Sequence, residues 1–121
     1  MCGETWVKAA YLHGSVARAA GPARDIDIGL LGDAPEWGAE LGIAGELQAA
    51  SGITAVDFDV RLVAGADPVF LGALLREGKL IYEADHEARI RFETQALSVW
   101  LDYQPVWERV RHAVTRRWAD D

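Results

Sequence analysis

With 121 residues, the chain is long enough for one domain with one hydrophobic core and too short for two. Its formal charge of -7 disfavours DNA and RNA as direct partners, because their phosphate backbones are bound mainly by lysine and arginine. No apolar stretch approaches the roughly 20 residues that cross a bilayer, and the N-terminus lacks a basic region followed by an apolar one. We therefore predict a single-domain cytoplasmic protein over residues 1–121, with no membrane partner.

Four strands are predicted along the first two thirds of the chain. Apolar and polar residues alternate there in short runs bounded by glycine or proline, which is typical of strands with one buried face. The predicted strands cover residues 7–13, 25–31, 53–63 and 79–83.

Helices are predicted between these strands. A short one follows the first strand, and a second runs from Pro35 to Gly52, because proline suits the first turn of a helix and glycine ends one. A third helix begins at Pro68, with Asp67 as its N-cap, and ends at Gly78.

Residues 86–118 are predicted to be a C-terminal helical segment. Ile90, Leu97 and Leu101 form an apolar stripe at helical spacing, and a second stripe follows Pro105, which is expected to interrupt the helix. Six arginines lie in this segment among few acids, so it is a candidate docking surface, with a solvated helix face as the alternative. The predicted fold class is α+β (α/β), a small mixed sheet with helices mainly on one face plus C-terminal helices.

Two carboxylates on the second strand are the first candidate site residues. Asp25 and Asp27 project to the same side of a strand, because side chains alternate between its faces. Two like charges so close repel each other unless a cation lies between them, and oxygen ligands of this kind suit Mg²⁺. Just upstream, Gly14 and Ser15 form a turn before a helix start, whose free N–H groups can bind a phosphate. Each feature alone is common, but their combination predicts a site for a metal-bound nucleoside triphosphate.

A third carboxylate is expected from the strand over residues 53–63. Its apolar residues alternate with Asp57, Asp59 and Arg61, so the two acids share a face. Periodicity alone permits either aspartate to join the metal site.

The residues from Gly14 to Arg18, followed by Asp25 and Asp27, resemble the signature of the minimal nucleotidyltransferases of the DNA polymerase beta superfamily. Residues 67–85 and 87–103 are similar to the MNT antitoxins that are paired with HEPN toxins. The resemblance covers the chain from Tyr11 to about Val114.

This resemblance implies a nucleotidyltransferase fold and a role for each motif residue. Asp25 and Asp27 would bind two Mg²⁺ ions, and Gly14 and Ser15 would hold the triphosphate of ATP. The spacing of the family's third acid from the proline that opens the next helix selects Asp59 over Asp57. Arg18 matches an arginine of the family's turn and would contact phosphate or brace the loop.

The function implied by the resemblance is that of an antitoxin. It would neutralise a cognate HEPN ribonuclease toxin by Mg²⁺-dependent transfer of AMP from ATP to a toxin tyrosine, with Asp59 as general base. A chain of this size leaves no room for a separate domain that binds the acceptor. We therefore expect a second chain to present the hydroxyl. The alternatives are a non-catalytic antitoxin that blocks the toxin by binding, and a nucleotidyltransferase that modifies small molecules such as antibiotics.

The sequence departs from the family pattern at several positions. The stretch between Ser15 and Asp25 is one residue shorter than usual, and Ala19 replaces a frequent glycine. His13 stands where an aromatic residue is usual, and a packing or capping role is favoured over contact with a nucleotide. The chain also starts almost at its first strand, so we expect another subunit, in a complex with the toxin or in a homodimer, to cover part of the sheet.

Overall fold

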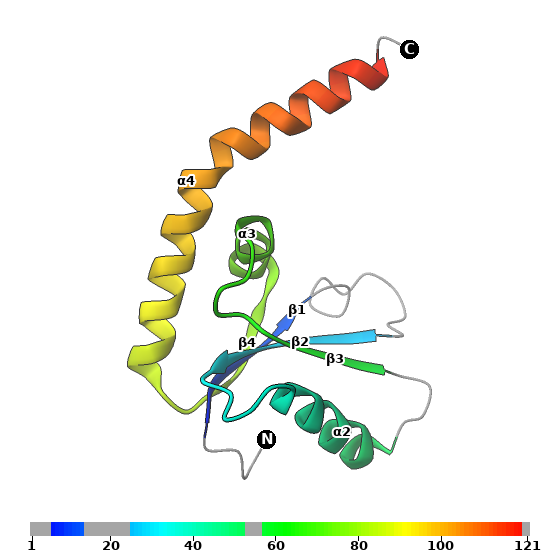
Figure 1. Cartoon of the computed structure of the whole chain (residues 1–121), viewed down its shortest axis with the longest axis vertical. Helices are drawn as coiled ribbons and strands as arrows, with labels where there is room; N and C mark the ends of the chain where they lie inside the picture. Colours follow the sequence, from blue (N-terminus) through cyan, green and yellow to red (C-terminus); the bar gives the residue numbers. More distant parts are fainter. Residues whose placement is uncertain (1–5, 14–24, 53–56, 120–121) are drawn as a thin grey trace.

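The computed structural model describes residues 6–13, 25–52 and 57–119, and these residues form one sheet and three helices (Figure 1). The strands are β1 (Val7–His13), β2 (Asp25–Gly32), β3 (Asp57–Leu62) and β4 (Lys79–Glu83). The helices are α2 (Ala39–Ser51), α3 (Pro68–Glu77) and α4 (His86–Ala119). The strand predictions are confirmed for the described residues, whereas the short helix predicted after β1 lies outside them.

The four strands form a mixed sheet in the order β3-β2-β1-β4. β1 pairs antiparallel with β2 and with β4, whereas β2 pairs parallel with β3. The predicted mixed sheet and α+β class are therefore confirmed. The parallel pair places the starts of β2 and β3 at the same end of the sheet, next to the end of β1.

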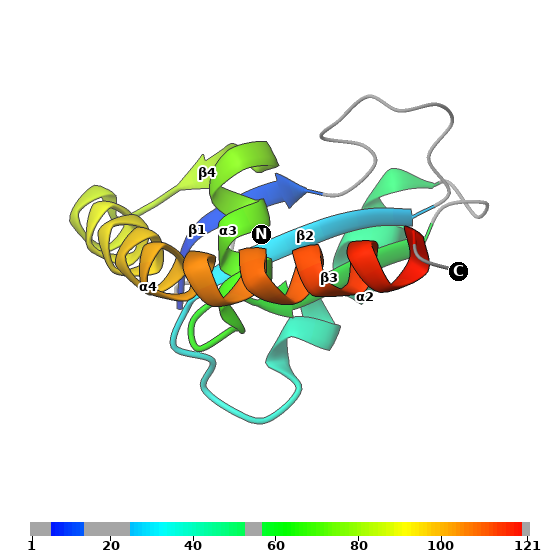
Figure 2. The same cartoon turned by 90° about the horizontal axis from the view of Figure 1, so that it is seen from above.

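The two faces of the sheet carry separate hydrophobic clusters. One cluster packs against α2 through its Ile43, and its buried members are Val7, Ala10, Ile28, Leu30, Ile43 and Val60. The other packs against α3 and α4, and its buried members are Ala9, Tyr11, Leu31, Val63 and Leu74. Neighbouring residues of one strand belong to opposite clusters, as the alternation of strand side chains requires. Two of the three helices thus share one face, and α2 covers the other (Figures 1 and 2).

The predicted start of α3 is confirmed in detail. Asp67 has extended backbone angles, and its carboxylate accepts a hydrogen bond of 2.8 Å from the backbone N–H of Phe70. Pro68 occupies the first turn, where the missing amide hydrogen costs nothing. At the other end, the N–H of Gly78 donates to the carbonyl of Leu74. These local bonds fix where α3 begins and hence where Phe70 lies.

The start of α2 differs from its prediction. Residues 35–38 form a turn, and the helix begins only at Ala39. Gly38 has a φ of 85°, in the left-handed region that only glycine enters readily, so the chain cannot be helical across this residue. The turn leaves the side chain of Trp37 97% exposed instead of packed on the helix face.

α4 is one helix of 34 residues with Pro105 inside it, so the predicted interruption is wrong. Proline removes a backbone hydrogen bond and kinks a helix without always ending it. Figure 1 shows α4 changing direction in its orange middle part. No helix among the described residues, α4 included, is both long and apolar enough to span a membrane.

The face of α4 that packs on the body is not the predicted stripe. Ile90, Leu97 and Leu101 are between 44% and 52% exposed. The buried residues of α4 are instead Ala88, Ala96 and Trp100, on the opposite side of the helix. Apolar residues on both sides of α4 made the choice of face ambiguous from periodicity alone.

Charged and polar side chains fix the start of α4 against the sheet. The Tyr11 hydroxyl donates to Glu93 at 2.8 Å, and Arg89 donates to the same carboxylate at 2.6 Å. Arg89 also donates to Glu83 of β4. Burial and the bond to Glu93 raise the pKa of Tyr11 well above its usual range, so its hydroxyl stays protonated and keeps donating. This network joins β1, β4 and α4.

A glycine-to-alanine pair tests the packing of α3 on α4. A Cβ at Gly72 would lie 2.5 to 2.8 Å from the Trp100 ring, whereas a Cβ at Gly45 of α2 would meet nothing within 4 Å. We expect Gly72→Ala to lower the free energy of unfolding by about 1–3 kcal/mol, because a buried ring must move. Gly45→Ala should raise it by about 0.5–1 kcal/mol through helix propensity. Urea unfolding followed by circular dichroism measures both, and equal effects would contradict this packing.

Candidate functional site

The candidate site lies where β2 and β3 begin. The parallel register pairs Asp27 with Asp59 and Asp25 with Asp57. Paired residues on neighbouring strands lie about 5 Å apart, so the register brings all four acidic positions to one end of the sheet. Asp27 is partly buried and Asp59 is exposed, while Asp25 and Asp57 are described by their backbone alone.

Alternation assigns these residues to the face of the sheet that α3 and α4 cover. Ile28 and Val60, each next to a paired aspartate in sequence, belong to the cluster under α2. Asp27 and Asp59 therefore project to the opposite face. Because neighbours in register share a face, their carboxylates are placed to bind one ligand together.

His13 adds a ring to this end of the sheet. It is the last residue of β1 and pairs with Asp27 across the antiparallel ladder. Its imidazole packs edge-on against Phe70 of α3, with ring centroids 5.3 Å apart and an interplanar angle of 87°. This contact agrees with the predicted packing role of His13.

Arg61 completes an aromatic and cationic cluster that sequence reasoning did not identify. Its guanidinium lies 3.9 Å from the centroid of the Phe70 ring, so Phe70 contacts both Arg61 and His13. A cation over an aromatic face is attracted by the ring quadrupole. The alternation of Asp57, Asp59 and Arg61 placed the arginine on the right face, but only the fold shows that Phe70 meets it.

The protonation of His13 depends on both neighbours. Burial lowers the pKa of His13, because the charged imidazolium loses water, and the Arg61 cation lowers it further. Asp27 and Asp59 act in the opposite direction without overcoming burial. The ring is therefore mainly neutral at pH 7. Its Nε2 atom is buried and has no hydrogen-bond partner among the described residues.

Gly29 leaves the space that the Val63 side chain occupies beside the His13 ring. A Cβ at Gly29 would lie 2.5 Å from Cγ1 of Val63 and 3.7 Å from Cδ2 of His13. Gly29 follows Asp27 by two residues and so lies on the same face. Its missing side chain lets Val63 pack against the sheet beside His13.

The donors present suit a hard cation such as Mg²⁺, which prefers carboxylate oxygens. Asp27 and Asp59 are the described residues that could hold it, with Asp25 two residues before Asp27. Among residues with described side chains, no group of three or more His, Cys, Asp or Glu is close enough to hold a metal ion. Because the Asp25 side chain is not described, the predicted set of three carboxylates stays a prediction. Gly14, Ser15 and Arg18, predicted to bind phosphate, lie outside the described residues.

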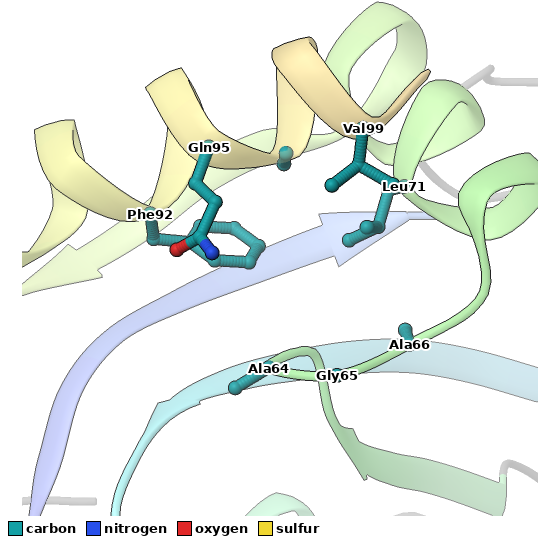
Figure 3. Close-up of a pocket in the computed structure, with 8 residues that line it drawn as sticks. Ala64, Gly65, Ala66, Leu71, Phe92, Gln95 and Val99 are labelled. Carbon is teal, nitrogen blue, oxygen red and sulfur yellow. The ribbon is translucent and has the colours of Figure 1, made fainter. Parts of the chain in front are cut away.

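A separate cavity of about 180 Å³ lies between α4 and the connection from β3 to α3 (Figure 3). Ala64, Gly65 and Ala66 form one wall, and Phe92, Gln95 and Val99 of α4 lie opposite them. The cavity is near the end of β3, whereas Asp59 is near its start. It is therefore distinct from the acidic site.

Comparison with known proteins gives one family and one fold. A family model described as "Polymerase beta, Nucleotidyltransferase" matches residues 3–87. No curated protein matches the sequence. A chain from a toxin–antitoxin crystal structure with AMP-PNP superposes with a TM-score of 0.73 at 21% identity, over 94% of this chain and 90% of that chain.

Two further solved structures are similar. One is described as a tri-AMPylated Shewanella oneidensis HEPN toxin in complex with MNT antitoxin, with a TM-score of 0.68 and 21% identity over 93% of this chain and 86% of that chain. The other is a MntA–HepT toxin–antitoxin complex, with a TM-score of 0.67 and 20% identity over 94% and 88%. At these identities the likeness shows a shared fold.

The titration of His13 tests the electrostatics of the site. We expect a pKa below the usual histidine value, lowered further by Asp27→Asn, which removes an anion, and raised by Arg61→Gln, which removes a cation. NMR of the imidazole resonances against pH, with EDTA present, measures all three values. Asp33→Asn is the control, because Asp33 is an exposed aspartate after the far end of β2. Shifts of the same sign in both site variants would contradict this arrangement.

Proposed function

This chain belongs to the polymerase beta nucleotidyltransferase family, and we propose that it is an antitoxin that transfers AMP from ATP to a tyrosine hydroxyl of a HEPN-family toxin. The family model covers residues 3–87, which include every candidate site residue. The observation that carries the proposal is the register of Asp27 with Asp59 at the starts of two parallel strands.

The nucleotide assignment rests on the residues at this end of the sheet. Asp25 and Asp27 would hold Mg²⁺, which neutralises phosphate charge in the transition state when bound. Gly14 and Ser15 would hold the β- and γ-phosphates through backbone N–H groups, and Arg18 would contact phosphate or brace the loop. One similar structure is described as containing AMP-PNP, a nucleotide analogue, which supports ATP as the donor.

The proposed chemical step transfers AMP to the tyrosine oxygen and uses one residue of this chain as proton acceptor. The tyrosine oxygen attacks the α-phosphorus of ATP. The bond from this phosphorus to the oxygen that bridges the α- and β-phosphates breaks, and pyrophosphate leaves. Asp59 accepts the proton of the attacking hydroxyl as general base. Asp59 is exposed, so an incoming hydroxyl from another protein can reach it. The products are the AMP ester of tyrosine and pyrophosphate.

A protein acceptor is supported by the similar structures. One is described as a tri-AMPylated HEPN toxin in complex with an MNT antitoxin. The cognate toxin here would be a HEPN-family protein that forms a hetero-oligomer with this chain. The compartment of such a pair is the cytoplasm, where ATP and the RNA substrates of the toxin are found.

A binding antitoxin without catalysis is the second candidate. The exposed apolar residues of α4, Ile90, Leu97 and Leu101 among them, favour it because they can cover a partner surface. A binder neutralises only at equimolar amounts, whereas an enzyme also acts at substoichiometric amounts.

Removing the two β2 aspartates tests the catalytic proposal. Asp25→Asn with Asp27→Asn should reduce transfer of label from α-labelled ATP to the toxin by at least about a hundredfold, because charge stabilisation of the transition state is lost. The measurement is autoradiography of toxin incubated with a tenfold molar deficit of antitoxin. Asp33→Asn with Asp102→Asn is the matched control, since both of these aspartates are exposed and lie outside the acidic end of the sheet, one after β2 and one on α4. Full labelling by the site variant refutes this mechanism, whereas full neutralisation of the toxin by an unlabelling site variant at equimolar amounts supports the binder.

The third carboxylate is tested by comparing two single variants. Asp59→Asn should lower the labelling rate about a hundredfold or more, because a metal ligand and the general base are lost together. Asp57→Asn should cost less than about tenfold through a change in local charge alone. Initial rates at saturating ATP and toxin measure both. The reverse order would assign the role to Asp57, whose backbone pairs with that of Asp25.

A further inference from the structure

The last part of α4 carries an apolar stripe that the described part of the chain does not bury. Residues 104–119 are here called the C-terminal arm. In the first half of α4, Ala88, Ala96 and Trp100 are buried against the body. At 100° per residue, Val106, Val110 and Val114 continue the same face of the helix. Yet every residue from 101 to 117 is exposed or only partly buried.

Basic residues flank this stripe on both sides. Helical spacing places Arg109 and Arg116 along one flank, Arg111 along the other, and Arg117 on the stripe itself near its far end. The arm contains four arginines and one glutamate, in a chain whose overall charge is -7. Glu108 pairs with Arg111 at 2.6 Å, which leaves the arm with a marked positive excess. A partner that fits this surface has an apolar stripe with acidic flanks.

A partner would also stabilise the arm. The arm extends a helix that the packed half of α4 already nucleates, but Pro105 removes one backbone hydrogen bond between the two halves, and no residue from 101 to 117 is buried. Val106, Val110 and Val114 lower its propensity further, since β-branched side chains lose rotamers in a helix. In globular proteins, most helix stability comes from packing of the apolar face.

The direction of the arm relates it to the acidic site. Figures 1 and 2 show the second half of α4 projecting from the body on the side of α3, toward the end of the sheet where β2 and β3 begin. Asp27 and Asp59 lie at that end and face the same side. A protein held along the apolar stripe of the arm therefore lies on the same side of the sheet as Asp27 and Asp59.

We propose that the C-terminal arm is the docking surface for the acceptor protein, and that it binds an amphipathic helix with an apolar stripe and acidic flanks. This inference rests on the proposed function, because it names the surface that presents the hydroxyl to Asp27 and Asp59. A second copy of the arm is a poorer occupant, since it would bring Arg109 and Arg116 of two chains together. The remainder of the acceptor then extends over the face of α3.

Two glutamate substitutions on the arm test the proposal. Val110→Glu places a charge within the stripe, whereas Thr115→Glu places the same charge on the side of the helix turned away from it. We expect Val110→Glu to raise the KM for the HEPN-family toxin about 10- to 100-fold, with kcat and the KM for ATP unchanged. Thr115→Glu should match the wild type. Circular dichroism checks that both variants keep their helix content.

The possible outcomes distinguish failure of the proposed docking surface from failure of the proposed AMP transfer. Unchanged KM for the toxin in Val110→Glu overturns the docking surface and leaves the proposed function standing. If the wild type itself fails to label the toxin, the proposed function fails, and direct titration of toxin onto the antitoxin decides the surface. In that titration, the docking surface is supported if Val110→Glu loses toxin binding while Thr115→Glu keeps it. Equal binding by both variants overturns the docking surface. A homodimer disrupted by Val110→Glu in sedimentation, with unchanged toxin affinity, also overturns it by assigning the arm to a second copy.

Discussion

The pairing of β2 with β3 is the constraint on which the candidate site depends. Their parallel register sets Asp27 beside Asp59, and the same register buries Ile28 and Val60 under α2. A slip of one residue would turn every side chain of one strand to the opposite face. Hydrophobic burial on one face therefore fixes the position of the acids on the other, and most of that stabilisation comes from residues that never contact a ligand.

Much of this arrangement was predictable because its signals are local. Alternation located the strands, and the sequence Asp67-Pro68 located the start of α3 through its cap and its missing amide hydrogen. The acidic face of β3 was predicted from the alternation of polar and apolar residues alone. This alternation did not decide between Asp57 and Asp59, since both occupy the same face. That choice required the family pattern, and the register pairs each of them with an aspartate of β2.

The rest depended on contacts between residues far apart in sequence. Periodicity offered two apolar faces on α4, and the packed one is the face that meets Gly72, where only a missing side chain admits the ring of Trp100. The contact of Phe70 with His13 and Arg61 joins three elements, so no single stretch of sequence indicates it. Neither the spacing of apolar residues nor a short motif indicates such contacts, because they exist only after the layers assemble.

Pro105 divides α4 into two mechanical parts. It has no amide hydrogen to offer the carbonyl of Leu101, one turn earlier, so the helix is weakest there. The half before it is held by Trp100 and by the Arg89 network, whereas no residue from 106 to 117 in the half after it is buried. A change in tilt would alter the reach of the far end while the strands stay fixed. Such a hinge would let the far end of α4 meet surfaces of different height while the pairing of Asp27 with Asp59 stays unchanged.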